Sequence, residues 1–124
     1  MEEHRKNVAV VGASPKEDRY SYKVMKLLEK MGHNPIPVAP VRKEILGRKV
    51  FPTLMEIPNK IDTITLYVSP VRQISVLNEA LSIKPKRIIF NPGTENPLEY
   101  NRLRKAGIEV IVACTLSMLC TDQF

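Results

Sequence analysis

Hydrophobic and polar residues alternate along the chain in two different periods, and the changes of period predict where strands and helices lie. Residues 8–11 are four consecutive apolar, mostly β-branched residues that end at Gly12, a pattern typical of a buried parallel strand. Apolar side chains then recur at helical spacing until Gly32, which predicts an amphipathic helix ended by a glycine. The buried stripe expected for this helix consists of Tyr20, Val24, Leu27, Leu28 and Met31.

The next apolar stretch, residues 34–39, predicts a second strand, and its prolines indicate where that strand lies. Pro35 and Pro37 occupy alternate positions, so both lack an N–H on the same side of the strand and leave only one side able to pair fully. We therefore expect this strand near a sheet edge. Residues 50–51 predict a short third strand after a basic loop over residues 41–49.

The rest of the chain continues to alternate between strand and helix patterns. Predicted elements are a capping-box turn over 53–56, strands over 63–68, 87–90 and 108–113, a helix over 70–82 capped by Ser69, and a helix from Pro97 to Gly107. The expected buried positions of these two helices are Val71, Ile74, Leu77 and Leu81 in the first, and Leu98 and Leu103 in the second. This alternation predicts an α/β fold: a Rossmann-like, doubly wound parallel sheet of about five strands in a three-layer α/β/α domain spanning residues 1–124.

Composition restricts the class of protein further. The chain has 124 residues, 44% of them hydrophobic and 26% charged, which fits one ordinary globular domain. No apolar run is long enough to cross a bilayer, and the charged first residues lack the apolar region of a secretory signal. The two cysteines do not make a disulfide framework. We expect a soluble cytoplasmic protein with reduced thiols.

The net charge of +6 and a pI near 9.5 favour an anionic partner. The basic residues are scattered, without a dense run or a nucleic-acid motif interleaved with aromatic residues. Nucleic acid is therefore not favoured. A solvated basic surface and a phosphorylated small ligand both remain open.

Four strand-to-helix turns should meet along the carboxyl edge of the predicted sheet, where such folds bind ligands. The first turn should aim free backbone N–H groups and a helix N-terminus at one point, which is the usual form of an anion site. Gly12 has an alternative role in relieving a crowded turn, and Ser14 also fits a helix start, although the apolar phase leaves it in the loop. The turns comprise Gly12, Ala13 and Ser14; Ala39, Pro40 and Val41; Val68, Ser69 and Pro70; and Asn91, Pro92, Gly93 and Thr94.

The residues after the second predicted strand bear on the identity of the nucleotide. NAD-binding folds usually place a carboxylate there to bind the adenosine ribose, whereas this chain has Arg42 and Lys43. Cations at that place suit a phosphorylated ribose, and the first turn has only one of the three glycines of the dinucleotide fingerprint. NADP and coenzyme A (CoA) therefore remain as candidate ligands, and NAD is much less favoured.

The chain resembles a known family, the small stand-alone CoA-binding domain proteins. These proteins are similar to the nucleotide-binding domain of the succinyl-CoA ligase α subunit. The resemblance covers nearly the whole chain. It is most specific in the Gly-Ala-Ser turn at 12–14, the Arg-Tyr-Ser-Tyr segment at 19–22 and the Glu-Ile-Leu-Gly loop at 44–47, and it extends over residues 8–16, residues 36–38 with Pro40, and residues 51–52.

The resemblance implies a set of residues that contact CoA or an acyl-CoA. Gly12, Ala13, Ser14, Tyr20 and Ser21 would surround the pyrophosphate, with Lys16 in the same motif. The remaining implied contacts are Pro40, Arg42 and Lys43 at the adenosine and its 3′-phosphate, Val68, Ser69 and Pro70 at the adenine or pantetheine, and Asn91, Pro92, Gly93 and Thr94 at the final turn.

Catalytic chemistry has few candidates in this sequence. The ligase carries its phosphorylated histidine on a second domain, and the two histidines here, His4 and His33, fit ordinary surface positions. Cys114 follows the last predicted strand, where its thiol would reach the ligand edge and form a mixed disulfide with CoA, or it packs as a small apolar group, as does Cys120. No metal-ligand spacing, paired carboxylates or Ser-His-Asp set is apparent.

The function expected from the sequence is therefore CoA or acyl-CoA binding by a binding or regulatory module. The alternatives are an NADP-binding reductase or ligase subunit, and a protein-interaction scaffold that has lost its ligand. The apolar tail at Leu116, Met118 and Leu119 either covers one end of the sheet or meets a second copy or a partner subunit.

Overall fold

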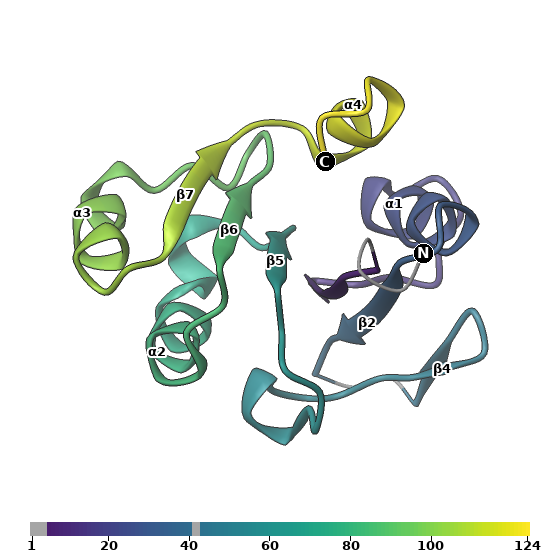
Figure 1. Ribbon diagram of the computed structural model, residues 1–124. Coiled ribbons are helices and arrows are strands. Elements are labelled where there is room, and N and C mark those ends of the chain that lie inside the picture. The colour runs from purple at the N-terminus through teal and green to yellow at the C-terminus, as the bar shows by residue number, and fades with distance from the viewer. Residues whose placement is uncertain (1–4, 41–42) are drawn as a thin grey trace.

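The computed structural model describes residues 5–40 and 43–124. Its main sheet has five parallel strands in the order β2-β1-β5-β6-β7 (Figure 1). These are β1 (Asn7–Val11), β2 (Asn34–Val38), β5 (Thr63–Leu66), β6 (Arg87–Phe90) and β7 (Glu109–Val112). The doubly wound parallel sheet predicted from the sequence is confirmed.

Helices cover both faces of the sheet (Figure 1). Helices α2 (Ile74–Ile83) and α3 (Pro97–Lys105) lie on one face, and α1 (Tyr20–Lys30) and α4 (Thr115–Cys120) lie on the other. Each face has its own buried apolar cluster, because strand side chains alternate between the two sides. One cluster includes Leu77, Phe90 and Leu103, and the other includes Met25 and Leu28.

Strand β2 lies at the edge of the sheet, as its prolines predict. Asn34 donates its backbone N–H to Lys6 on the β1 side, whereas the carbonyl of Pro37 accepts from the N–H of Phe51 on the outer side. The bond to Phe51 belongs to a single parallel bridge between Val38 and Phe51, which confirms the short third strand in reduced form. Counting that bridge, the chain order across the sheet is the 3-2-1-4-5-6 order of Rossmann folds.

The predicted basic loop after β2 contains a small antiparallel hairpin. It consists of β3 (Glu44–Ile45) and β4 (Arg48–Lys49). The turn predicted after it is a short 3₁₀ helix, η2 (Leu54–Glu56). The prediction of a capping box is wrong, because Thr53 makes no side-chain cap bond. The N–H of Leu54 donates to the carboxylate of Glu79.

The helical periods are confirmed in general, but several predicted buried faces are wrong. In α1 the buried residues are Ser21, Val24, Met25 and Leu28. This stripe has regular helical spacing but begins at a polar serine, so the sequence pattern pointed instead to Tyr20 and Met31, which are exposed. The helix therefore presents Tyr20 to the carboxyl edge of the sheet.

The two following helices start differently from the prediction. Residues after Ser69 form a 3₁₀ turn, η3 (Pro70–Arg72), without a side-chain cap, and α2 begins only at Ile74. This change of winding turns Val71 and Ile74 outward, and Val71 is 90% exposed. Leu98 in α3 is 92% exposed, because Leu103 and Tyr100 supply the contact with the sheet.

The apolar tail forms α4, which packs against α1 and contributes Leu119 to the core beneath it. Packing within the chain therefore explains why the tail is apolar. No helix in the described part of the chain is both long and apolar enough to span a membrane.

At the opposite end of the sheet from the strand-to-helix turns, His33 lies in a partly buried cluster of basic and aromatic groups. Its Nδ1 accepts the backbone N–H of Lys6, and its ring packs edge-on against Phe124 at 5.3 Å between centroids. Burial lowers the pKa of His33 below its ordinary value of 6.5, and the charges of Lys6 and Arg87 lower the pKa further.

We expect this histidine to make the free energy of unfolding depend on pH. Because its pKa is lower in the folded protein, the unfolded chain binds more protons as pH falls below 6.5, and stability is lost down to the folded pKa. Denaturant unfolding from pH 7.5 to 5.5 should show this loss. The His33→Asn variant keeps an acceptor for Lys6 but does not titrate, so its pH slope should be shallower; equal slopes would contradict the assignment.

Candidate functional site

The carboxyl edge of the sheet has its point of reversal between β1 and β5, since β2 lies on one side of β1 and the later strands lie on the other. Doubly wound folds bind ligands at this point. The chain leaves β1 through Gly12 and leaves β5 through Tyr67, and these two residues pack closely together and line the same cavity. The candidate site is therefore built around the Gly12 turn.

Gly12 is required by both its conformation and its surroundings. Its φ of +90° is one that L side chains rarely adopt, and a Cβ built there would lie 3.0 Å from the carbonyl carbon of Tyr67 and 3.0 Å from Cγ1 of Val68. A larger residue would force the two turns apart. The alternative role considered for Gly12, relief of a crowded turn, is thus a real part of its function.

The backbone amides of this turn are not free. The N–H groups of Gly12 and Ala13 both donate to the carbonyl oxygen of Val38, at 3.0 and 3.2 Å. The prediction that these two amides are available to an anion is wrong. The carboxyl end of β2 holds them, so the turn is a fixed support and any anion has to be bound by the residues that follow.

Unpaired amides occur at the next positions along the chain. Within the described residues, the N–H groups of Ser14, Tyr20 and Ser21 donate to no protein acceptor. Ser14 lies in the loop, where its Oγ accepts the N–H of Lys16 at 3.1 Å, so the loop interpretation of Ser14 is confirmed. Ser14, Tyr20 and Ser21, together with Gly12, Arg19 and Tyr67, line a cavity of about 190 Å³.

The start of α1 lacks the side-chain cap and the acidic residue that usually stabilise a helix N-terminus. Arg19 is the N-cap residue and makes no side-chain cap bond, and the first turn of the helix contains no acidic residue. A cation at this position is unfavourable for the helix dipole, whereas an anion is favourable. Glu17 and Asp18 precede the helix but are exposed and accept none of its N–H groups. The geometry therefore offers a small anion both N–H donors and a positive charge.

A larger cavity of about 380 Å³ adjoins the first. Its lining residues are Tyr20, Tyr67, Asn91, Pro92, Cys114, Leu116 and Ser117. Tyr20 and Tyr67 line both cavities, so the two form one crevice along the carboxyl edge of the sheet. Burial raises the pKa of Tyr67 to about 12, and its phenol is therefore a neutral hydrogen-bonding group at neutral pH.

Cys114 is the thiol that lines the larger cavity. Burial alone would raise its pKa, but hydrogen bonds from the Ser117 side chain and from the backbone of Ser117 and Leu116 outweigh that effect and lower it overall. Cys120 is also a free thiol, but it is exposed at the end of α4 and does not line the cavity.

Two buried carboxamides hold the walls of the crevice in place. Asn91 donates to Oγ1 of Thr65 and to the carbonyl of Leu66, and accepts from the N–H of Thr115. It thereby joins the ends of β5 and β6 to the start of α4. Both of its polar atoms are used within the protein, so Asn91 faces the cavity as part of a rigid wall.

Gln73 plays the equivalent part between the turns after β5 and β6. Its Nε2 donates to the carbonyls of Val68 and Thr94, and its Oε1 accepts from Asn96. Sequence patterns did not point to this residue, because a buried glutamine at the start of a helix has no periodic signature. Thr94 is likewise turned inward, with its hydroxyl donating to the carbonyl of Asn91.

The structure thus brings some of the sequence-predicted residues together and separates others from the crevice. Gly12, Ser14, Tyr20, Ser21, Asn91 and Pro92 line it. Arg19, Tyr67, Leu116 and Ser117 also line it but were not among the predicted contacts, because their place at the crevice depends on tertiary packing. Residues that line neither cavity are Ala13, Lys16, Pro40, Lys43, Val68, Ser69, Pro70, Gly93 and Thr94, while Arg42 is outside the described residues.

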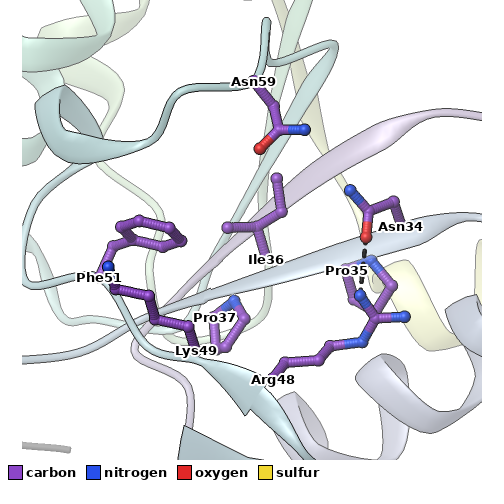
Figure 2. Close-up of a pocket in the computed structure, with 8 residues that line it drawn as sticks. All are labelled: Asn34, Pro35, Ile36, Pro37, Arg48, Lys49, Phe51 and Asn59. Atoms are coloured by element: carbon purple, nitrogen blue, oxygen red, sulfur yellow. Dashed lines mark hydrogen bonds between the residues drawn. The ribbon is translucent and has the colours of Figure 1, made fainter. Parts of the chain in front are cut away.

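A separate cavity of about 220 Å³ lies on the outer edge of β2 (Figure 2). Its principal charged group is already paired, since Arg48 donates to Asn34 at 2.7 Å and to Glu29 at 2.7 Å. Lys49 lies over the ring of Phe51 at 5.2 Å. These contacts attach the β3-β4 hairpin to the sheet edge, and the cavity is less suited to a phosphorylated ligand than the crevice. Elsewhere in the described chain, no group of three or more His, Cys, Asp or Glu side chains is arranged to hold a metal ion.

Comparison with known proteins identifies relatives of the chain. Residues 6–119 match the family model described as a CoA binding domain. A Bacillus subtilis (strain 168) protein, the uncharacterized protein YneT, is 33% identical over 107 residues, which are 86% of this chain and 79% of that protein. A solved structure of an uncharacterized protein has a TM-score of 0.87 and 40% identity, and the match covers 97% of this chain and 98% of the other.

A larger enzyme shares the same domain. Acetate–CoA ligase [ADP-forming] I from Archaeoglobus fulgidus is 35% identical over 108 residues. The match covers 85% of this chain but only 16% of the ligase. The resemblance predicted from the Gly-Ala-Ser turn and the Arg-Tyr-Ser-Tyr segment is therefore confirmed at the level of the family.

The contact between Gly12 and Tyr67 predicts a specific loss of stability. Gly12→Ala should lower the free energy of unfolding by about 2 kcal/mol or more, because it adds a strained backbone and a clash with a main-chain atom. Gly107→Ala is the matched control, since Gly107 has a φ of +87° but nothing within 4 Å of its added Cβ. Chemical denaturation should show the smaller loss, about 1 kcal/mol, for the control. Equal losses would mean that the close approach to Tyr67 carries no energy.

Proposed function

Because the chain belongs to the CoA-binding-domain family, we propose that it binds CoA or an acyl-CoA in the crevice, with the ligand's pyrophosphate at the start of α1. The observation that carries this proposal is that the N–H groups of Ser14, Tyr20 and Ser21 have no acceptor among the described residues, beside a helix start without a side-chain cap. A diphosphate supplies the acceptors and the negative charge that this helix end lacks.

The charge around the smaller cavity supports the same ligand. Arg19 lines the cavity, and Lys23 lies one turn further along α1 with its ammonium 5.4 Å from the centre of the Tyr20 ring. Both are exposed and free to turn toward a bound phosphate. Long-range attraction by a chain with a net charge of +6 favours the encounter.

The ends of the ligand are assigned by the direction of the crevice. The pantetheine arm runs from the smaller cavity past Tyr20 and Tyr67 into the larger one, where Pro92 forms part of the wall. The adenosine and its 3′-phosphate then lie on the β2 side, toward Pro40 and Lys43, which are exposed. Arg42, outside the described residues, belongs to this same part of the proposal.

We further propose that the chain acts as a binding or regulatory module. Its fold supplies a ligand crevice in which the buried carboxamides of Asn91 and Gln73 are committed to holding the walls. An NADP-binding reductase or ligase subunit would use the same phosphate site with a different second half of the ligand. A protein-interaction scaffold would not need the ligand, and the titrations below separate these alternatives.

Calorimetric titration of CoA, dephospho-CoA, NADPH and NAD tests the proposal. CoA should bind most tightly, dephospho-CoA more weakly because it lacks the 3′-phosphate, and the nicotinamide nucleotides least. Preference for NADPH over CoA would support the reductase alternative. The absence of binding by any of the nucleotides would contradict the proposed function and favour the scaffold.

The role of the α1 start is tested by removing the charge that lines the smaller cavity. Arg19→Gln should weaken CoA binding about five- to tenfold, the effect expected for one charge-assisted contact with phosphate. Arg104→Gln in α3 is the matched control, because it removes one exposed positive charge at a residue that lines neither cavity. If both variants weaken binding equally, net charge and not the α1 start determines affinity.

A further inference from the structure

We propose that the larger cavity of the crevice is an acyl subsite that selects a short, uncharged acyl group. This inference rests on the proposed function and goes beyond it, because it names the class of acyl-CoA that the protein prefers. The argument comes from the position of the cavity, the chemistry of its lining and its size.

The position of the cavity follows from the two aromatic residues that the cavities share. A ligand with its phosphates beside Ser14 and Ser21 reaches the larger cavity by passing Tyr20 and Tyr67. Cys114, which also lines the larger cavity, lies two residues after the end of β7. The thiol end of a pantetheine arm that enters here therefore lies in the larger cavity together with anything attached to it.

The lining of this cavity combines apolar groups with the uncharged polar side chains of Tyr67, Asn91, Cys114 and Ser117. Tyr20, Pro92 and Leu116 present rings and methyl groups, and the carboxamide of Asn91 is fully used by Thr65, Leu66 and Thr115. Among the described residues that line it, none is Lys, Arg, Asp or Glu. An acyl chain gains from such surroundings, whereas a carboxylate would lose its hydration there without finding a cation.

The size of the cavity restricts the length of the acyl group. Its volume of about 380 Å³ is near the lower end of the range of about 300 to 1,000 Å³ found for small-molecule sites. Because the end of the pantetheine arm occupies part of this volume, only a short acyl chain can share it. A long chain would have to leave the cavity into solvent.

Titration with a series of acyl-CoA ligands tests this inference, since the nucleotide is the same in each and its contribution cancels. Butyryl-CoA should bind about fifteenfold more tightly than acetyl-CoA, because it adds two buried methylenes and each contributes about fourfold. Succinyl-CoA has the same number of acyl carbons as butyryl-CoA but ends in a carboxylate, and it should bind at least about tenfold more weakly than butyryl-CoA. Decanoyl-CoA should gain nothing over butyryl-CoA.

A variant that fills the cavity supplies a second test. Leu116→Trp should abolish the advantage of butyryl-CoA over acetyl-CoA and leave binding of 3′-phosphoadenosine 5′-diphosphate, which lacks the arm, within about twofold of the native value. Leu98→Trp is the matched control at an exposed residue of α3, and it should preserve the whole acyl series.

The cysteines provide a readout that needs no variant and therefore does not depend on correct folding of one. Bound butyryl-CoA should slow alkylation of Cys114 by iodoacetamide, while Cys120, which is exposed and outside the cavity, reacts at an unchanged rate. 3′-Phosphoadenosine 5′-diphosphate should protect neither thiol.

The outcomes separate this inference from the proposed function. Equal or tighter binding of succinyl-CoA than of butyryl-CoA would overturn the acyl subsite while leaving CoA binding intact. Binding of CoA without protection of Cys114 by butyryl-CoA would overturn it in the same way. Failure of every CoA ligand and of 3′-phosphoadenosine 5′-diphosphate to bind would overturn the proposed function itself, and the acyl subsite with it.

Discussion

The arrangement of the site depends on the close packing of two turns at the point where the strand order reverses. Gly12 approaches the main chain of Tyr67 so closely that a Cβ would lie 3.0 Å from its carbonyl carbon. On the other side, the carbonyl of Val38 accepts both amides of the Gly12 turn. The turn is therefore held from β2 and β5 together, and α1 starts at a fixed place relative to both strands. This fixed start is what places unpaired N–H groups at the crevice.

In the proposed site, holding the turn and binding an anion are carried out by different amides of the same segment. Gly12 and Ala13 donate to Val38, whereas Ser14, Tyr20 and Ser21 donate to no acceptor in the part of the chain that the structure describes. Such a division has a physical advantage, because donors that an anion needs are positioned by bonds that do not change when the anion binds. The buried carboxamides of Asn91 and Gln73 do the same for the opposite wall, since they tie three turns together by hydrogen bonds that no ligand has to supply.

Most of the fold followed from local patterns, because each pattern had one dominant cause. Strand β1 was predictable from its uninterrupted apolar run, and Pro35 and Pro37 placed β2 at the sheet edge through their missing N–H groups. The buried face of α1 was not predictable, because it starts at Ser21, whose burial depends on the neighbouring elements. The exposure of Val71 and Leu98 likewise depends on 3₁₀ winding and on the docking of Tyr100.

The candidate site was predictable in place but not in detail. The sequence located the turn at Gly12 and the edge of the sheet, whereas the partners of individual amides depend on register between strands distant in the sequence. Val38 accepting two N–H groups and Tyr67 lining both cavities are consequences of tertiary packing. They have no signature in the spacing of residues, so the sequence pointed to amides that the fold itself uses.

Residue-resolved amide hydrogen exchange, measured by NMR with and without saturating CoA, tests the central claim most directly. In the free protein, Gly12 and Ala13 should exchange slowly, while Ser14, Tyr20 and Ser21 should exchange rapidly, because only the first two have an acceptor among residues 5–40 and 43–124. CoA should slow exchange at Ser14, Tyr20 and Ser21 and leave Gly12 and Ala13 unchanged. Unaltered exchange at all of these positions with CoA bound would show that the start of α1 does not hold the diphosphate.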